Sequence, residues 1–169
     1  MGERVDKELK GTPLSTEDFE KNRVCTTTSD PHALYAWDTG IGIGRFLKEL
    51  KAGKIFGTHC RRCKRTVVPP RVFCELCMSA NIEWKELKDT GRINTFSLCY
   101  VDWDAKIVKE PFLPAVIEID GASPGCGILH VLDEVNPKAV KIGMKVQAVW
   151  KEPIERKGDI TDIKYWKPT

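Results

Sequence analysis

The spacing of hydrophobic residues predicts two short helices in the first third of the chain. Residues 1–15 are polar and without periodicity, which is typical of a tail that contributes little to a core. A first helix is predicted to open at Ser15, because Ser15 and Asp18 resemble an N-cap followed by an acidic first turn. This helix is expected to run through Phe19 toward Val24.

The second helix follows a turn-rich stretch. Four apolar residues recur at the helical spacing i, i+3, i+4 and i+7, namely Ile43, Phe46, Leu47 and Leu50. Gly53 is expected just beyond the helix end, where a left-handed residue is common. Because two short helices cannot form a core alone, their apolar faces must pack on the rest of the chain or on another protein. In the second case, Phe46, Leu47 and Leu50 would dock on the partner.

From Gly91 onward the apolar residues alternate with polar ones, which predicts strands. The first run contains Phe96, Leu98 and Tyr100 and the second contains Ala115, Ile117 and Ile119. Three more strands are predicted within 126–132, 146–150 and 160–166, each preceded by turn residues. Five short strands in about 75 residues, with an insertion at 133–142, favour a Greek-key barrel of the OB type, and an SH3-like barrel is the competing assignment.

The expected fold class is therefore mainly β with N-terminal helices. Three parts are predicted along the chain: a tail and helical hairpin over 1–53, a rubredoxin-like zinc ribbon over 54–88 and a five-stranded OB-type barrel over 89–169. The composition, 41% apolar and 30% charged, is that of a globular protein. The sequence offers no run of about 18 apolar residues to span a membrane and no signal peptide at residues 1–10, so a cytoplasmic location is predicted.

Four of the seven cysteines form two tight pairs. They are Cys60 with Cys63 and, after ten residues, Cys74 with Cys77. Each C-x-x-C turn places two thiolates on one knuckle, and two knuckles together supply the tetrahedral ligand set of a structural zinc ion. Because no residue supplies an open coordination position with a general base, the metal is expected to be structural. The same ligands suit iron, and a rubredoxin-like electron carrier stays open at this point.

The order of these parts along the chain resembles that of a known family. The motifs that carry the resemblance are Gly53-Lys54-Ile55 before the first cysteine pair, Pro69-Pro70-Arg71 before the second, and Gly91-Arg92-Ile93 before a small barrel. The chain is similar, over roughly residues 15–167, to the zinc ribbon and OB-fold proteins long called a domain of unknown function, whose members accompany thiolases and other acyl-CoA enzymes. It departs from the common pattern at Lys64 and Met78, where glycine is frequent, and at Glu75, where proline is frequent.

The resemblance implies a non-catalytic accessory or scaffold subunit of an acyl-CoA-processing complex. The implied partner is a thiolase-type enzyme, in some members together with hydroxymethylglutaryl-CoA synthase in the isoprenoid route, and the implied ligand is coenzyme A or an acyl-CoA. Coenzyme A needs cations for its phosphates beside an apolar channel. Candidate phosphate contacts are the ribbon's basic residues, which otherwise form a solvated face: Arg61, Arg62, Lys64, Arg65 and Arg71.

Two other functions compete with this interpretation. An OB barrel with aromatic residues could bind single-stranded nucleic acid, although Phe96 and Tyr100 fall on the same face as Leu98 in the alternating run and resemble core residues. An enzyme could use Cys126 with His130, but four residues along a strand separate them by roughly 13 Å, so Cys126 is expected to be a small buried side chain. Cys25 and Cys99 are given the same interpretation. The candidate aromatic platform consists of Phe96, Tyr100, Trp103, Trp150, Tyr165 and Trp166.

Overall fold

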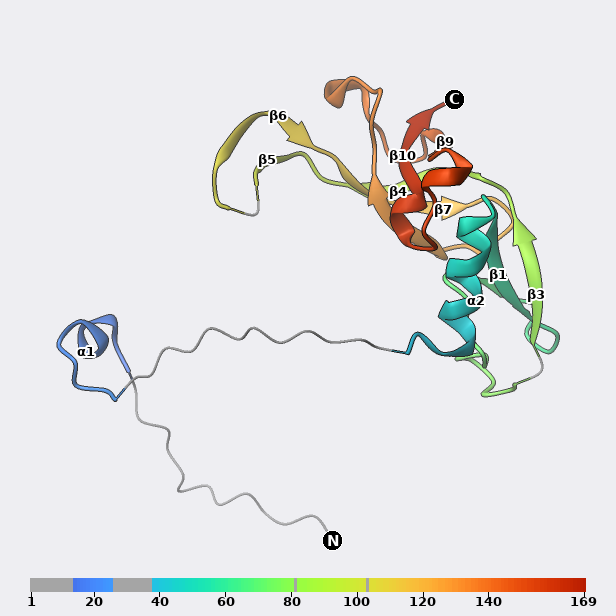
Figure 1. The fold of residues 1–169 in the computed structure, drawn as a ribbon, viewed down its shortest axis with the longest axis horizontal. Coiled ribbons are helices and arrows are strands. Elements are labelled where there is room, and N and C mark those ends of the chain that lie inside the picture. The colour runs from blue at the N-terminus through green and yellow to red at the C-terminus, as the bar shows by residue number, and fades with distance from the viewer. Residues whose placement is uncertain (1–13, 26–37, 81, 103) are drawn as a thin grey trace, which may run out of the picture. The chain divides into compact units, whose positions relative to one another are not determined.

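The structure is a computed structural model that describes residues 14–25, 38–80, 82–102 and 104–169 (Figure 1). The chain divides into two units, residues 1–36 and residues 37–169. In the first unit, α1 (Thr16–Glu20) begins as predicted: the backbone N–H and the hydroxyl of Ser15 donate hydrogen bonds of 2.9 and 2.7 Å to Asp18. The helix ends at Glu20, before Val24. Because residues 26–37 lie outside the described residues, the helical hairpin stays a prediction.

In the second unit, α2 (Gly40–Lys51) lies against the β-structure (Figure 1). Phe46 and Leu50 are 3% and 0% exposed, and Leu47 packs beside them. Of the two alternatives, packing of this face on the rest of the chain is therefore the one found, and docking of Phe46, Leu47 and Leu50 on a partner is wrong because the internal core already uses them. Gly53 has a φ of 77°, which confirms its place just beyond the helix end.

The ribbon sheet is antiparallel, with the strand order β2-β1-β3. It consists of β1 (Ile55–Cys60), β2 (Thr66–Val67) and β3 (Ile82–Leu87). The guanidinium of Arg45 on α2 lies 4.4 Å from the ring centroid of Trp84 on β3 and 5.8 Å from that of Phe56 on β1. These cation–π contacts hold the helix against the ribbon sheet.

The barrel is a five-stranded antiparallel sheet with the order β10-β9-β4-β7-β8. Its strands are β4 (Thr90–Phe96), β7 (Pro114–Ile119), β8 (Gly127–Val131), β9 (Lys145–Trp150) and β10 (Ile163–Pro168). A parallel bridge between Leu132 and Trp166, with the Asp133 N–H donating to the Trp166 carbonyl at 3.0 Å, joins the first and last strands of this order. The predicted five-stranded OB-type barrel is confirmed.

Three short 3₁₀ helices lie in the connections of the barrel. They are η1 (Pro137–Ala139) in the predicted insertion, η2 (Pro153–Glu155), and η3 (Ile160–Asp162) directly before β10. The last strand therefore begins three residues later than the predicted range of 160–166.

A hairpin that the sequence did not predict leaves the barrel between β4 and β7. It consists of β5 (Cys99–Val101) and β6 (Ile107–Phe112), and it projects away from the barrel in Figure 1. Phe96 packs against the core, but Leu98 and Tyr100 are 40% and 49% exposed. The assignment of Tyr100 to the core is wrong, because β4 stops pairing with β7 at Phe96 and the alternation continues into the hairpin.

Ribbon and barrel share one hydrophobic core. Leu50 of α2 and Ile55 of β1 belong to the same buried cluster as Ile117, Val146 and Trp166 of the barrel. Disruption of either part is therefore expected to weaken the other.

Asp162 holds the loop before β10 in place. Its carboxylate is fully buried and accepts backbone N–H bonds from Lys157, Gly158 and Asp159 at 2.9, 2.7 and 3.3 Å. We expect Asp162→Ala to lower the free energy of unfolding by at least about 1–3 kcal/mol, the cost of one unsatisfied buried donor. Urea unfolding measures this loss. Asp162→Asn, which keeps an acceptor oxygen, is the control and should lose less stability than Asp162→Ala. Equal stability of the wild type and Asp162→Ala would contradict the role of Asp162 in holding the loop.

Candidate metal centre and adjoining pocket

The four predicted cysteines converge on one point. Their Sγ atoms all lie within 4.8 Å of one another, and the Sγ atoms of Cys60 and Cys77 are 3.7 Å apart. Zinc–sulfur bonds of about 2.3 Å place the sulfurs of a regular tetrahedron roughly 3.8 Å apart. The cluster therefore has the dimensions of a tetrathiolate metal site.

Two backbone turns of the same kind shape the knuckles. Lys64 N–H donates to the Cys60 carbonyl and Met78 N–H to the Cys74 carbonyl, each at 2.8 Å. Lys64 and Met78 have φ values of 58° and 53°, in the left-handed region that favours glycine. Two of the three departures from the family pattern, Lys64 and Met78, thus occupy positions where glycine would relieve strain, while the ligand geometry is kept.

The thiol cluster contains groups with strongly shifted acidity. Hydrogen bonding to Cys77, together with burial, raises the pKa of Cys63 to about 12. Backbone N–H donors of Cys77 and Leu76 lower the pKa of Cys74 to about 7. Because the thiolate is the form that binds metal, these backbone N–H groups favour the ligating state of Cys74.

The five basic residues do not converge on one point. Arg61 forms an ion pair with Glu83. Arg62 and Lys64 are exposed and have no ion-pair partner within the residues that the structure describes. Arg65 and Arg71 both form ion pairs with Glu75: their Nη1 atoms lie 2.9 and 3.7 Å, respectively, from the carboxylate oxygens of Glu75. Sequence reasoning missed Glu75 as the carboxylate that neutralises part of this charge.

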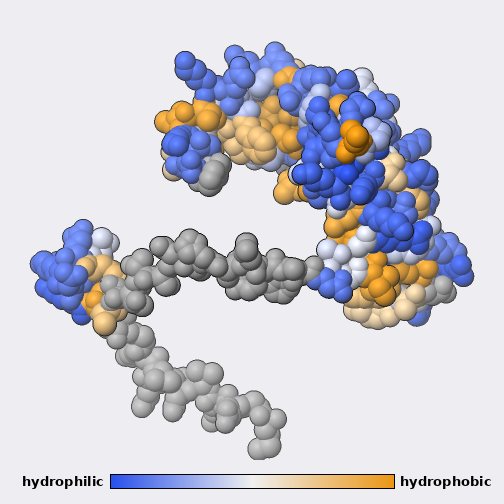
Figure 2. All heavy atoms as spheres, in the orientation of Figure 1, coloured by the Kyte–Doolittle hydropathy of each residue, from blue (hydrophilic) through white to orange (hydrophobic). Residues whose placement is uncertain are grey.

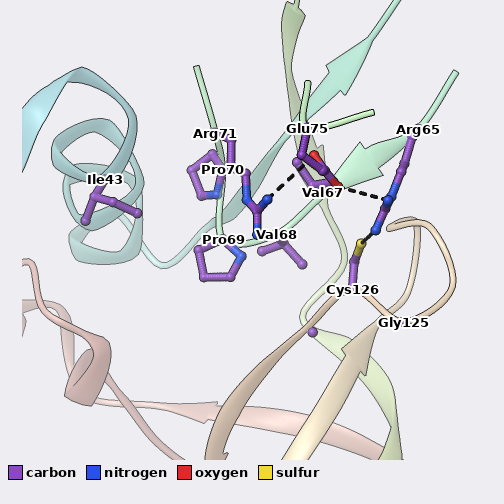
Figure 3. A pocket seen from close by; sticks show the side chains of 11 residues that line it. Ile43, Arg65, Val67, Val68, Pro69, Pro70, Arg71, Glu75, Gly125 and Cys126 are labelled. Carbon is purple, nitrogen blue, oxygen red and sulfur yellow. Dashed lines mark hydrogen bonds and ion pairs between the residues drawn. The ribbon is translucent and has the colours of Figure 1, made fainter. Parts of the chain in front are cut away.

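Arg65 and Arg71 line a pocket of about 420 Å³ where the ribbon meets the barrel (Figure 3). Arg65 also donates to the Cys126 thiol at 3.5 Å, and this hydrogen bond is the main reason that the pKa of Arg65 is raised above its ordinary value. The remaining wall is largely apolar and comes from α2, the ribbon arm and the turn before β8. It is made by Ile43, Val67, Val68, Pro69, Pro70, Gly125 and Gly127. Glu75, which pairs with both arginines, also lines the pocket, so the pocket combines two cations and one carboxylate with an apolar surface.

Cys126 and His130 do not form a dyad. Cys126 is buried against Arg65, whereas Nε2 of His130 lies 3.3 Å from the carbonyl of Ile160. Gly127 pairs regularly with Glu118, and a Cβ at Gly127 would lie 2.3 Å from the Ile117 carbonyl oxygen, so glycine here permits close strand approach and not a bulge.

The two other cysteines outside the cluster differ from the expectation. Cys25 is exposed and Cys99 is partly exposed, so describing them as small buried side chains is wrong. Both lie outside the regions that pack into the core.

The aromatic residues offer little platform for nucleic acid. Trp166 is fully buried, and Trp150 packs on the core beneath Arg156, whose guanidinium lies 5.5 Å from its ring. The hydroxyl of Tyr165 donates to Glu134. Trp103 lies outside the described residues. Among the described members of the candidate platform, Tyr100 alone is mostly free to stack on a base.

None of the described helices is long and apolar enough to cross a membrane.

Fold and thiolate cluster together define a protein made of a zinc ribbon joined to an OB barrel. Residues 47–83 match the rubredoxin-like zinc ribbon domain of ChsH2, and residues 84–151 match the C-terminal OB-fold domain of ChsH2. The chain therefore belongs to the ChsH2-type, or DUF35, family of zinc ribbon and OB-fold proteins.

Similar proteins are known from archaea. A DUF35 domain-containing scaffold protein of Methanocaldococcus jannaschii is 29% identical over 113 residues, which cover 66% of this chain and 77% of the relative. A scaffold protein of the same description from Methanothermobacter thermautotrophicus is 23% identical over 110 residues, covering 64% and 80%. These relatives are thus described as scaffolds.

Two solved structures share the fold. A DUF35 family protein of unknown function from Sulfolobus solfataricus has a TM-score of 0.58 and 26% identity, covering 74% of this chain and 83% of that one. A chain of the Ltp2-ChsH2(DUF35) aldolase also has a TM-score of 0.58, with 19% identity over 80% and 98% of the two chains. At 19% identity, the similarity to the aldolase chain shows a shared fold and nothing more.

Proposed function

We propose that this chain is a non-catalytic zinc-binding scaffold subunit of an acyl-CoA-processing complex. The observation that carries the proposal is the fusion of a tetrathiolate ribbon to an OB barrel through one core, in a chain that is 29% identical to a relative described as a scaffold protein. The main partner is a thiolase-type enzyme, with hydroxymethylglutaryl-CoA synthase as a candidate second partner. The complex works in the cytoplasm, where thiolates remain available to metal.

Cys60, Cys63, Cys74 and Cys77 hold a structural zinc ion in this proposal. All four thiolates are used, and the metal has no open position for a substrate. Zinc would act by joining the two knuckles and thereby fixing the ribbon on the barrel. The chemistry of acyl transfer belongs to the partner enzyme.

The pocket between ribbon and barrel is the place where this subunit contacts coenzyme A thioesters. Arg71 is 56% exposed at its side chain and lies 3.7 Å from Glu75, so it can turn toward a phosphate without losing a close ion pair. The apolar wall suits a pantetheine arm. Arg62 and Lys64, on the first knuckle, add positive charge that has no ion-pair partner in the described part of the chain.

Replacing Arg71 by glutamine is expected to weaken coenzyme A binding by the assembled complex about tenfold, as loss of one charge-assisted hydrogen bond of about 1.5 kcal/mol would do. Isothermal titration of coenzyme A into the complex measures the change. Lys164→Gln, on the exposed face of β10, is the control and should bind as wild type does. A complex that binds no coenzyme A would contradict the contact.

A further inference from the structure

An apolar surface covers the end of the second unit (residues 37–169) at which α2 begins. It includes Ile41 and Ile43 at the start of α2, Val72 and Phe73 after the ribbon arm, and Leu76 and Met78 on the second knuckle, and we name these six residues the knuckle patch. Ile41, Leu76 and Met78 are 82%, 63% and 74% exposed. Figure 2 shows hydrophobic side chains gathered at this end, below α2. Apolar gatherings of this kind on a folded domain mark interaction sites.

The fold holds the knuckle patch in a fixed shape. A Cβ at Gly42 would lie 3.4 Å from Cγ1 of Val72, so the first turn of α2 packs directly on the loop. Leu76 stands between two cysteines of the metal cluster, which fixes its backbone. Between the helix start and the loop lies a hollow of about 380 Å³, lined by Ile41, Phe73 and their neighbours. A preformed hollow favours a protruding protein side chain over a lipid surface, because hot-spot anchors fill such pockets.

The charge around the knuckle patch selects an acidic partner. Arg61 is paired with Glu83, and Arg65 and Arg71 share Glu75, whereas Arg62 and Lys64 are exposed and have no ion-pair partner among the described residues. Arg62 and Lys64 stand on the first knuckle, which the thiol cluster holds beside the second. Aromatic residues, methionine and arginine are also the types enriched in protein interfaces.

We propose that the knuckle patch is the surface by which this chain binds its partner enzyme, at an apolar site ringed by carboxylates on that enzyme. This inference rests on the scaffold function proposed above. The rim charges steer the encounter, so association should slow as ionic strength rises. The apolar contacts supply most of the binding free energy.

The test introduces negative charge into the knuckle patch without disturbing the fold. Ile41→Glu adds an acid to the first turn of α2, where the helix dipole favours it, and Met78→Glu changes a side chain that is 74% exposed. Ile154→Glu, at a residue 95% exposed on η2, is the matched control. Each tagged chain is expressed in the native host and purified, and the amount of acyl-CoA enzyme captured with it is measured. The zinc content and the melting temperature of each tagged chain are measured as well.

Wild type and Ile154→Glu are expected to capture the enzyme in equal amounts, whereas Ile41→Glu with Met78→Glu should capture at least tenfold less while keeping zinc and melting temperature. Full capture by the double variant would overturn this inference and leave the scaffold function standing. A wild-type chain that captures no acyl-CoA enzyme would overturn both. Binding of the patch to anionic phospholipid vesicles, with enzyme capture unchanged by the substitutions, would also overturn the inference.

Discussion

Replacing Cys74 by serine is expected to remove the metal and unfold the ribbon. Cys74 is 4% exposed, and backbone N–H groups favour its thiolate, so a neutral hydroxyl there is a poor ligand. Zinc binding supplies on the order of 10 kcal/mol to comparable small modules. Zinc content should fall from one per chain to near zero, and amides of β1 and β3 should lose protection from hydrogen exchange. Because the core is shared, the barrel should also melt at lower temperature.

Cys99→Ser provides the matched control, because Cys99 lies on β5 outside the thiol cluster. This variant should retain one zinc per chain and the protection of the ribbon. Metal analysis and hydrogen exchange by mass spectrometry decide the matter. A Cys74→Ser chain with full zinc content and unchanged protection from hydrogen exchange would show that the cluster is not the metal site. Iron bound in place of zinc would make the wild-type protein visibly coloured.

Truncating Trp166 to alanine should be the most damaging change in the barrel. Its side chain is fully buried, and its backbone makes the bridge that joins β10 to the end of β8. A large-to-small change at such a site costs about 3–5 kcal/mol, because it removes buried apolar surface and leaves a cavity. Urea unfolding of the zinc-loaded chain should show this loss in the transition midpoint.

Trp166→Phe separates packing from hydrogen bonding. The indole nitrogen of Trp166 has no hydrogen-bond partner in the described part of the chain, so phenylalanine loses volume but no bond. We expect the phenylalanine variant to retain most of the stability that alanine loses. Comparable losses for the two substitutions, or no loss for alanine, would contradict the role of Trp166 as the main filler of the barrel core.

The sequence predicts those structural features that depend on neighbouring residues, but not those that depend on packing between distant segments. The cysteine spacing predicted the thiol cluster because each knuckle is a local turn, and the alternating runs predicted the five barrel strands. Alternation indicates which face of a strand is buried, as at Ala115, Ile117 and Ile119, but it does not show where pairing with the neighbouring strand stops. For that reason the pattern places Tyr100 in the core, whereas in the structure β4 leaves β7 after Phe96 and Tyr100 is exposed.

The pocket depends on residues that are distant in sequence. Arg65 meets Cys126 across 61 positions, and neither residue type nor spacing indicates the contact. Likewise, the basic run from Arg61 to Arg71 suggested one anion site, but Glu83 and Glu75 take part of that charge. The face of α2 was also ambiguous in sequence, because a helix that docks on its own barrel and one that docks on a partner have the same periodicity.

Affinity purification of the tagged wild-type chain from its native host, with nuclease treatment and mass spectrometry, tests the scaffold function most directly. Stoichiometric recovery of a thiolase or a hydroxymethylglutaryl-CoA synthase that survives nuclease is the result predicted by the account. Recovery of nuclease-sensitive ribonucleoprotein or DNA-processing proteins, without an acyl-CoA enzyme, would contradict it and make the barrel a nucleic-acid-binding module.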